Sequence, residues 1–97
     1  MNRKKLIYSI LKEIDKGNIP KFDEYELNKE QWNEIIILIK NEELLNGVSI
    51  LYADDEVYYV SIDSAKLTFK GINFLEENNA WTKTYNSIKE ARDWLKI

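Results

Sequence analysis

Five serines are the potential nucleophiles of this chain of 97 residues, but the sequence contains no histidine to activate them. A hydroxyl without an adjacent base is a weak nucleophile, and a lysine acting as that base is recognised only from geometry. The paired carboxylates Glu42-Glu43 and Glu76-Glu77 fall in helical stretches, where charged side chains usually face solvent. We therefore expect no catalytic residues and no enzyme activity.

Metal and cofactor chemistry have equally little support. Without His or Cys, only oxygen ligands remain for a metal ion. The run Asp54-Asp55-Glu56 offers such oxygens but lacks the spaced ligands and the glycine of a calcium loop. The chain also has no Gly-rich phosphate loop and no nucleotide fingerprint. We expect no metal site and no cofactor.

The remaining possibility is that surface side chains bind DNA or a protein partner. The candidate contacts are Arg3, Lys4, Lys5, Lys12, Lys29, Gln31, Asn33, Ile37, Lys40 and Asn41. The first four would bind the phosphate backbone, and the amides could read adenine bidentately. Basic and amide side chains on a helix are, however, more often simply solvated.

Charge and composition limit the classes of protein to which this chain can belong. The net charge is −3, with residues 1–17 at +3 and residues 18–62 at −7. The lack of cysteine and of a signal-peptide pattern favours the cytoplasm. The longest apolar run, 35–39, is too short to span a bilayer, so no membrane association is expected. We expect one domain over residues 1–97.

The first elements to position these residues are helices. Apolar residues at helical spacing predict a helix from Arg3 to Lys16, ended by Gly17 in a left-handed conformation. Its face with Lys5, Ser9, Lys12 and Lys16 is expected to be solvated. Asp23 is expected to cap a short helix that ends near Leu27.

A second long helix is expected to start at Asn28, with Gln31 completing a capping box, and to run to about Glu43. Trp32, Ile35, Ile36 and Ile39 would be buried, whereas Glu30, Glu34, Ile37 and Asn41 would face outward. Two helices joined by a short turn predict a helix-turn-helix within residues 1–47.

Residues 48–62 predict a wing-like hairpin, because 48–52 and 57–62 are rich in β-branched and aromatic residues. The turn, residues 53–56, is expected to be four residues long. Its tip is acidic, whereas a wing that grips DNA presents Lys or Arg. A solubilising tip that protects the hairpin edge from aggregation is the expected role.

Helices are predicted over the remaining residues 67–97. Thr68 is the expected N-cap, and Leu67 would pack on Ile72 as a hydrophobic staple. Gly71 is costly in a helix, so a neighbour such as the hairpin is expected to approach it closely. After Asn78-Asn79, the spacing of apolar residues predicts a helix of about 14 residues over Trp81–Leu95. That helix would either dock on the domain or pair with a second subunit.

The chain also resembles the YjcQ family of small bacterial and phage proteins. The resemblance lies in residues 5–14, in Leu67-Thr68 through Gly71, and in residues 85–96. It implies a winged-helix fold and no established activity or ligand. The turn from Leu67 to Gly71 is also similar to the one after the wing in winged-helix regulators, which implies DNA binding.

We therefore expect an α+β fold, a winged helix-turn-helix with a two-stranded wing and additional C-terminal helices. Two functions remain open. The first is a transcription-regulatory domain that binds duplex DNA, as a homodimer through the Trp81–Leu95 helix. The second is an interaction module that binds a host or phage protein and has lost its DNA-binding face.

Overall fold

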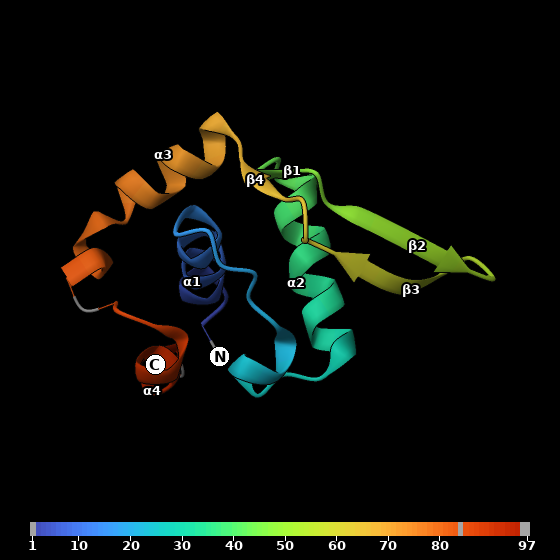
Figure 1. Ribbon diagram of the computed structural model, residues 1–97, viewed down its shortest axis with the longest axis horizontal. Helices are drawn as coiled ribbons and strands as arrows, with labels where there is room; N and C mark the ends of the chain where they lie inside the picture. The colour runs from blue at the N-terminus through green and yellow to red at the C-terminus, as the bar shows by residue number, and fades with distance from the viewer. Residues whose placement is uncertain (1, 84, 96–97) are drawn as a thin grey trace.

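Helix α1, Arg3–Asp15, lies at the centre of the computed structural model, which describes residues 2–83 and 85–95. Helix α2, Lys29–Asn41, lies on one side of it, and α3, Phe69–Glu77, and α4, Ile88–Leu95, lie on the other (Figure 1). The described residues thus form an α+β structure of four α-helices with two small antiparallel sheets.

The core forms where the apolar faces of α1 and α2 meet. The predicted helical spacing is confirmed, since the buried side chains include Leu6, Ile7, Ile10, Leu11, Trp32, Ile35, Ile36 and Ile39. Burial of each such side chain stabilises the fold by roughly 1.5–3 kcal/mol relative to exposure. Gly17 ends α1 at a φ of 90°, as expected for a left-handed stop.

The predicted capping box of α2 is also confirmed. The Asn28 Oδ1 atom accepts a hydrogen bond from the Gln31 amide at 2.9 Å, and Gln31 Oε1 accepts one from the Asn28 amide at 3.0 Å. The expected short helix capped by Asp23 is wrong in type and start. It is a single 3₁₀ turn, η1, over Phe22–Tyr25, because Glu26 takes a φ of 60° and breaks it.

Two separate two-stranded sheets follow α2. Strand β1, Leu45–Asn46, pairs with β4, Lys66–Leu67, and β2, Ser49–Ala53, pairs with β3, Glu56–Ser61. We call β2 and β3 the hairpin. Its turn has two residues rather than the expected four, since Ala53 pairs directly with Glu56. Asp54 and Asp55 both take positive φ, as a type I′ turn requires.

Helix α3 begins where the sequence predicted, with Thr68 as its N-cap. The Thr68 hydroxyl accepts from the Gly71 amide at 3.0 Å and donates to the Glu43 carbonyl at 2.5 Å. The expected close approach at Gly71 is confirmed, because a Cβ there would collide with the carbonyl oxygen of Leu44. The neighbour is therefore the chain after α2, and not the hairpin.

The prediction of one helix over Trp81–Leu95 is wrong. A 3₁₀ turn, η2, spans Asn79–Lys83, and α4 starts only at Ile88, where the Ser87 carbonyl accepts from the Ala91 amide at 2.9 Å. Of the two alternatives for its apolar side chains, docking is the one observed: Tyr85, Ile88, Ala91 and Leu95 are buried against the domain. No helix among the described residues is long and apolar enough to cross a membrane.

Candidate interaction surface

A chain of buried hydrogen bonds joins α1 to the C-terminal segment, residues 79–95. The Ser9 hydroxyl lies 2.8 Å from the Tyr25 hydroxyl and 2.7 Å from that of Tyr85, which donates to Glu13 Oε2 at 2.6 Å. Each hydroxyl has one proton to give. Because Tyr85 gives its proton to Glu13, it accepts from Ser9, and Ser9 in turn accepts from Tyr25. We call these four side chains the hydroxyl chain.

The far end of the hydroxyl chain is anchored at Glu13, which is only 5% exposed. Its Oε1 atom accepts from the Asn18 amide group at 2.9 Å, and its Oε2 atom lies 3.7 Å from the Lys16 ammonium. Burial raises the pKa of both the Tyr25 and the Tyr85 hydroxyl, so both stay neutral near pH 7. Buried polar side chains that are bonded in this way hold a fold together.

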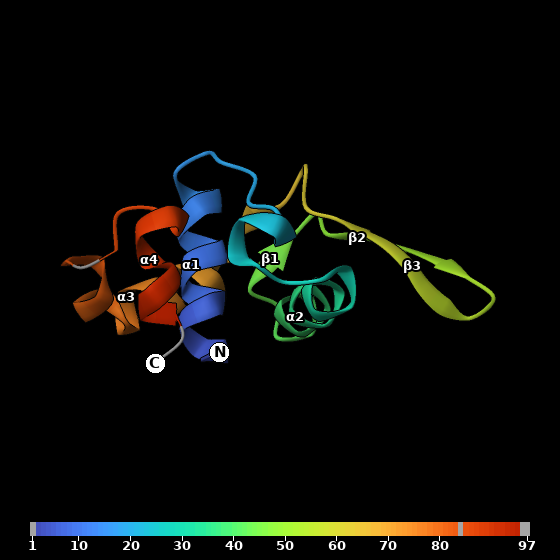
Figure 2. The ribbon, with the colours of Figure 1, turned by 90° about the horizontal axis from the view of Figure 1, so that it is seen from below.

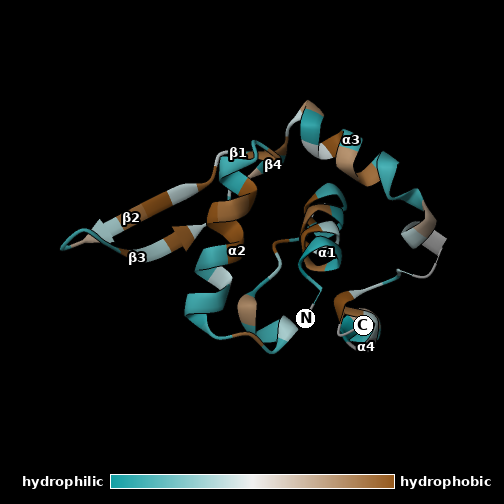
Figure 3. Ribbon diagram, turned by 180° about the vertical axis from the view of Figure 1, so that it is seen from behind, coloured by the Kyte–Doolittle hydropathy of each residue, from teal (hydrophilic) through white to brown (hydrophobic). Residues whose placement is uncertain are grey.

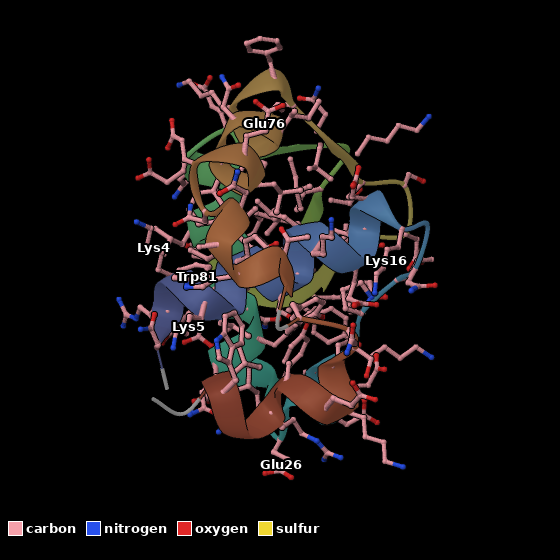
Figure 4. All side chains as sticks on the ribbon, turned by 90° about the vertical axis from the view of Figure 1, so that its left-hand side faces the viewer. Lys4, Lys5, Lys16, Glu26, Glu76 and Trp81 are labelled. Carbon is pink, nitrogen blue, oxygen red and sulfur yellow. The ribbon has the colours of Figure 1, made fainter. Side chains whose placement is uncertain are left out.

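The face of α1 that was expected to be solvated is covered at its centre, although Lys16 remains exposed and Lys5 and Lys12 are half-buried. Ser9 has no exposed surface, and Figure 4 shows the central α1 between α3 and α4, with Lys5 and Lys16 near its two ends. The Lys5 ammonium lies 4.9 Å from the centre of the Trp94 ring, and that of Lys16 donates to the Asn86 carbonyl. The prediction failed because residues about 76 positions away in sequence cover this face.

Aromatic rings complete the cover over α1. The Tyr8 ring meets those of Trp81, Tyr85 and Trp94 edge to face, at centroid distances of 5.4, 6.0 and 6.3 Å. Such pairs contribute about 0.5–1.5 kcal/mol each beyond the area they bury. These ring surfaces are packed against one another within the domain, so little of their area is available to a partner.

The hairpin, by contrast, projects away from the helices, as the views in Figure 1 and Figure 2 agree. It carries four large exposed side chains: Leu51 at 56%, Tyr52 at 65%, Tyr58 at 74% and Tyr59 at 51%. Apolar side chains clustered on one exposed element are typical of a binding surface, whereas single ones are not.

The strand register explains this exposure. Leu51 pairs with Tyr59, but Tyr52 pairs with Val57, which leaves Tyr58 as the extra residue of a β-bulge. The neighbouring Val60 is buried in the core, and Val57 packs against the core from the inner face. The hairpin therefore has an apolar side that holds it to the domain and further aromatic side chains that the domain does not use.

The charge around these tyrosines is negative. Residues 41–65 contain six acidic side chains and no Lys or Arg. Three of them, Asp54, Asp55 and Glu56, lie exposed at the tip, the hydrophilic end of an otherwise largely hydrophobic hairpin in Figure 3. Their summed field repels phosphate and attracts cations.

A groove of about 280 Å³ runs beside β3. One wall is formed by Tyr58 through Asp63, and the facing wall by Ile19 through Asp23. Trp32 at the start of α2 also lines it, together with Lys29 and Asn33. This groove lies next to the exposed tyrosines. The hairpin therefore offers a partner a groove along β3 in addition to its projecting side chains.

The residues predicted to contact DNA or a partner lie on several surfaces. Arg3 and Gln31 line a depression between α1 and α2 with Glu34, whereas Lys29 and Asn33 line the hairpin groove and Lys40 borders a third depression. Lys4 and Asn41 are exposed, Lys12 is half-buried, and Lys5 covers Trp94. Ile37, expected to face outward, is half-buried and packs against the core.

Sequence reasoning missed the exposed tyrosines as site residues. One signal was present, because β3 carries large apolar or aromatic residues at consecutive positions, Val57 to Val60, rather than in alternation with polar ones. A hairpin that packs on only one side alternates. Among the described residues, no group of His, Cys, Asp or Glu is arranged to hold a metal ion.

Comparisons with known proteins agree on one group. A family model described as "YjcQ protein" matches residues 8–94. The "Uncharacterized protein YjcQ" of Bacillus subtilis strain 168 is 39% identical, over 99% of this chain and all of that protein. The solution NMR structure of the YjcQ protein from Bacillus subtilis aligns at a TM-score of 0.58 and 31% identity, covering 79% of this chain and 96% of that one.

Proposed function

The chain belongs to the YjcQ family, and we propose that it is a winged-helix domain that binds another protein through its hairpin. The observation that carries this proposal is the exposure of Leu51, Tyr52, Tyr58 and Tyr59 on an element that projects from the domain. Tyrosine is enriched in protein interfaces and among the residues that contribute most to binding.

The order of elements supports the winged-helix part of the proposal. A central helix, a short turn of helix and a second long helix precede a two-stranded hairpin. In winged-helix proteins the second long helix is the one that reads DNA and the hairpin is the wing. In the proposed winged-helix fold, α2 would be that second helix and the hairpin would be the wing, after which β4 and Thr68 lead into α3.

Electrostatics favours a protein over duplex DNA as the partner. On α2, the exposed Glu30 and Glu34 separate the exposed Lys29 from Lys40. Two further basic side chains already have partners within the domain, since Arg92 pairs with Glu26 at 3.0 Å and the Lys5 ammonium lies over the Trp94 ring. Non-specific DNA affinity comes mainly from Lys and Arg that neutralise phosphates, and an acidic hairpin opposes it.

We also propose that the domain catalyses no reaction. Ser9 is bonded to the hydroxyls of Tyr25 and Tyr85, which could move a proton, but it has no exposed surface for a substrate. Burial raises the pKa of Tyr25 and Tyr85, so both hydroxyls stay protonated near neutral pH and neither can act as a general base. Their geometry serves the docking of the C-terminal segment.

Capture from an extract of the host cells tests the choice of surface. The intact chain should retain a specific protein, identified by mass spectrometry, that the double variant Tyr58→Ser, Tyr59→Ser loses. Phe69→Ser is the matched control, because Phe69 is 78% exposed on α3, away from the hairpin. Equal capture by both variants would move the interface off the hairpin.

Titration with random-sequence duplex DNA tests the rival function. At 50 mM salt and micromolar protein we expect no binding. Binding that falls steeply with added salt and is lost in Lys29→Ala, Lys40→Ala would identify α2 as a DNA-reading helix and would overturn the proposal.

A further inference from the structure

The geometry points to a specific mode of recognition: we propose that an extended, basic segment of the partner adds to β3 as a third strand and lies in the groove beside it. This inference rests on the proposed function, because it assumes that the hairpin is the binding element. It goes further by stating the conformation and the chemistry of what is bound.

The first argument is the free edge of β3. One edge pairs with β2, and no other strand of the described residues joins that sheet. A free edge presents unpaired backbone amide and carbonyl groups, to which an extended peptide can bind by strand addition. Edges are usually protected by charges, especially Lys, but residues 57–62 of this strand contain no charged side chain.

The second argument is the shape of the space beside that edge. The groove follows β3 from Tyr58 to its end at Ser61, continues along Ile62 and Asp63, and is also lined by Pro20 and Phe22. A strand rises about 3.3 Å per residue and points alternate side chains to opposite faces. A bound segment could therefore pair with the backbone of β3 and direct every second side chain toward Trp32.

The third argument is charge complementarity. At its base, the groove balances Lys21 and Lys29 against Asp23 and Asp63. At the turn, Asp54, Asp55 and Glu56 take part in none of the ion pairs formed among the described residues, and residues 41–65 contain no Lys or Arg. A Lys or Arg of the partner is thus best placed at the turn, next to the carboxylates and against the exposed Tyr58 ring, where a cation–π contact is worth about 0.5–1 kcal/mol.

Nuclear magnetic resonance titration of the full ¹⁵N-labelled chain tests the mode directly. The probe is a nine-residue peptide in which Val alternates with Thr and which ends in two Arg residues. We expect saturable shifts confined to the amides of residues 56–63, 19 and 21–23 and to the Trp32 indole. The same peptide with Glu in place of Arg should bind at least fivefold more weakly, and one N-methylated at every residue, which has no backbone donor on either edge, should not bind.

The matched charge variants are Asp54→Asn, Asp55→Asn at the turn and Glu76→Gln, Glu77→Gln on α3. Both remove two negative charges, and Asn tolerates the positive φ of the two turn positions. We expect the turn variant to weaken the basic peptide about fivefold and the α3 variant to leave it unchanged.

Several results would overturn the inference: no saturable shifts at millimolar peptide, equal binding of the Arg and Glu peptides, binding of the N-methylated peptide, or shifts outside the groove. These outcomes are separable from failure of the proposed function. If a partner is captured through Tyr58 and Tyr59 while strand addition fails, the hairpin is an interface of another geometry.

Discussion

The two most aromatic regions of this domain, the cover over α1 and the hairpin, differ in where their polar and apolar groups find partners. In the cover, Tyr8, Tyr85 and Trp94 pack on one another, and the hydroxyl chain ends at a carboxylate with further donors. On the hairpin, Tyr52, Tyr58 and Tyr59 lie largely in solvent.

This difference in burial indicates that the cover contributes to stability and that the hairpin is available for binding. A tyrosine that is buried and hydrogen-bonded contributes to folding, because its area is removed from water and its hydroxyl has a partner. A tyrosine that is largely exposed contributes little to the free energy of unfolding, and its exposed area remains available to another molecule. We therefore expect substitutions in the cover to change stability and substitutions in the hairpin to change association.

The largest effect is expected at the anchor of the hydroxyl chain. Glu13→Ala would leave the Tyr85 hydroxyl and the Asn18 amide without their acceptor. We expect the free energy of unfolding to fall by about 3 kcal/mol, measured by urea denaturation. Glu76→Ala, at an exposed position of α3, is the control and should change it by less than about 0.5 kcal/mol. A comparably small effect at Glu13 would remove the distinction between the two regions.

Alkaline pH is a second way to distinguish the tyrosines of the cover over α1 from those of the hairpin. The unfolded chain releases the tyrosine protons near the ordinary pKa of 10.0, but burial raises the folded pKa of Tyr25 and Tyr85. The free energy of unfolding should therefore be unaffected by these groups below pH 10. Above it, stability should fall by as much as about 1.4 kcal/mol per pH unit for each tyrosine.

The Tyr85→Phe variant should lose about half of that alkaline slope, read from urea midpoints between pH 9 and pH 11. Tyr58→Phe should keep the full slope, because the Tyr58 hydroxyl takes no part in the hydroxyl chain. An equal reduction in both variants would show that the hydroxyl chain does not hold its protons as described.

A smaller effect is expected at the edge of the cover. Lys5→Ala removes an ammonium group that lies 4.9 Å from the Trp94 ring centre. We expect a loss of about 0.5–1 kcal/mol, detected by thermal unfolding, together with a change in Trp fluorescence. Lys4→Ala, one position earlier on the exposed side, should change neither quantity.

The smallest effect on stability is expected in the hairpin itself. Tyr58→Ser should alter the free energy of unfolding by less than about 0.5 kcal/mol, yet it should reduce partner binding by tenfold or more. Calorimetric unfolding and the binding assay on the same preparation provide both numbers. A loss of stability as large as that at Glu13 would show that Tyr58 supports the fold.

The features that could be predicted from sequence are those set by neighbouring residues. The helical spacing of α1 and α2, the capping box of Asn28 with Gln31, and the N-cap at Thr68 all depend on contacts within one turn of chain. The close approach at Gly71 could be inferred from the cost of glycine in a helix, although its neighbour, Leu44, could not.

The features that could not be predicted depend on distant residues. Ser9 looked solvated because its neighbours on α1 are lysines, and only the arrival of Tyr85 buries it. The spacing of Trp81, Tyr85 and Ile88 fitted one helix, but Trp81 lies in η2, Ile88 begins α4, and Tyr85 lies in the chain between these two elements. For the site, composition indicated an acidic hairpin, whereas the bulge that exposes Tyr58 depends on cross-strand register.

The closed base of the hairpin has a consequence for how the protein can evolve. Leu45 pairs with Leu67, and Thr68 bonds to the chain just after α2. These contacts hold together the segment that enters the hairpin and the segment that leaves it. The exposed part beyond Leu51 can then accept substitutions with little cost to folding. Relatives that share this frame could acquire different partners by changing a few residues near the turn.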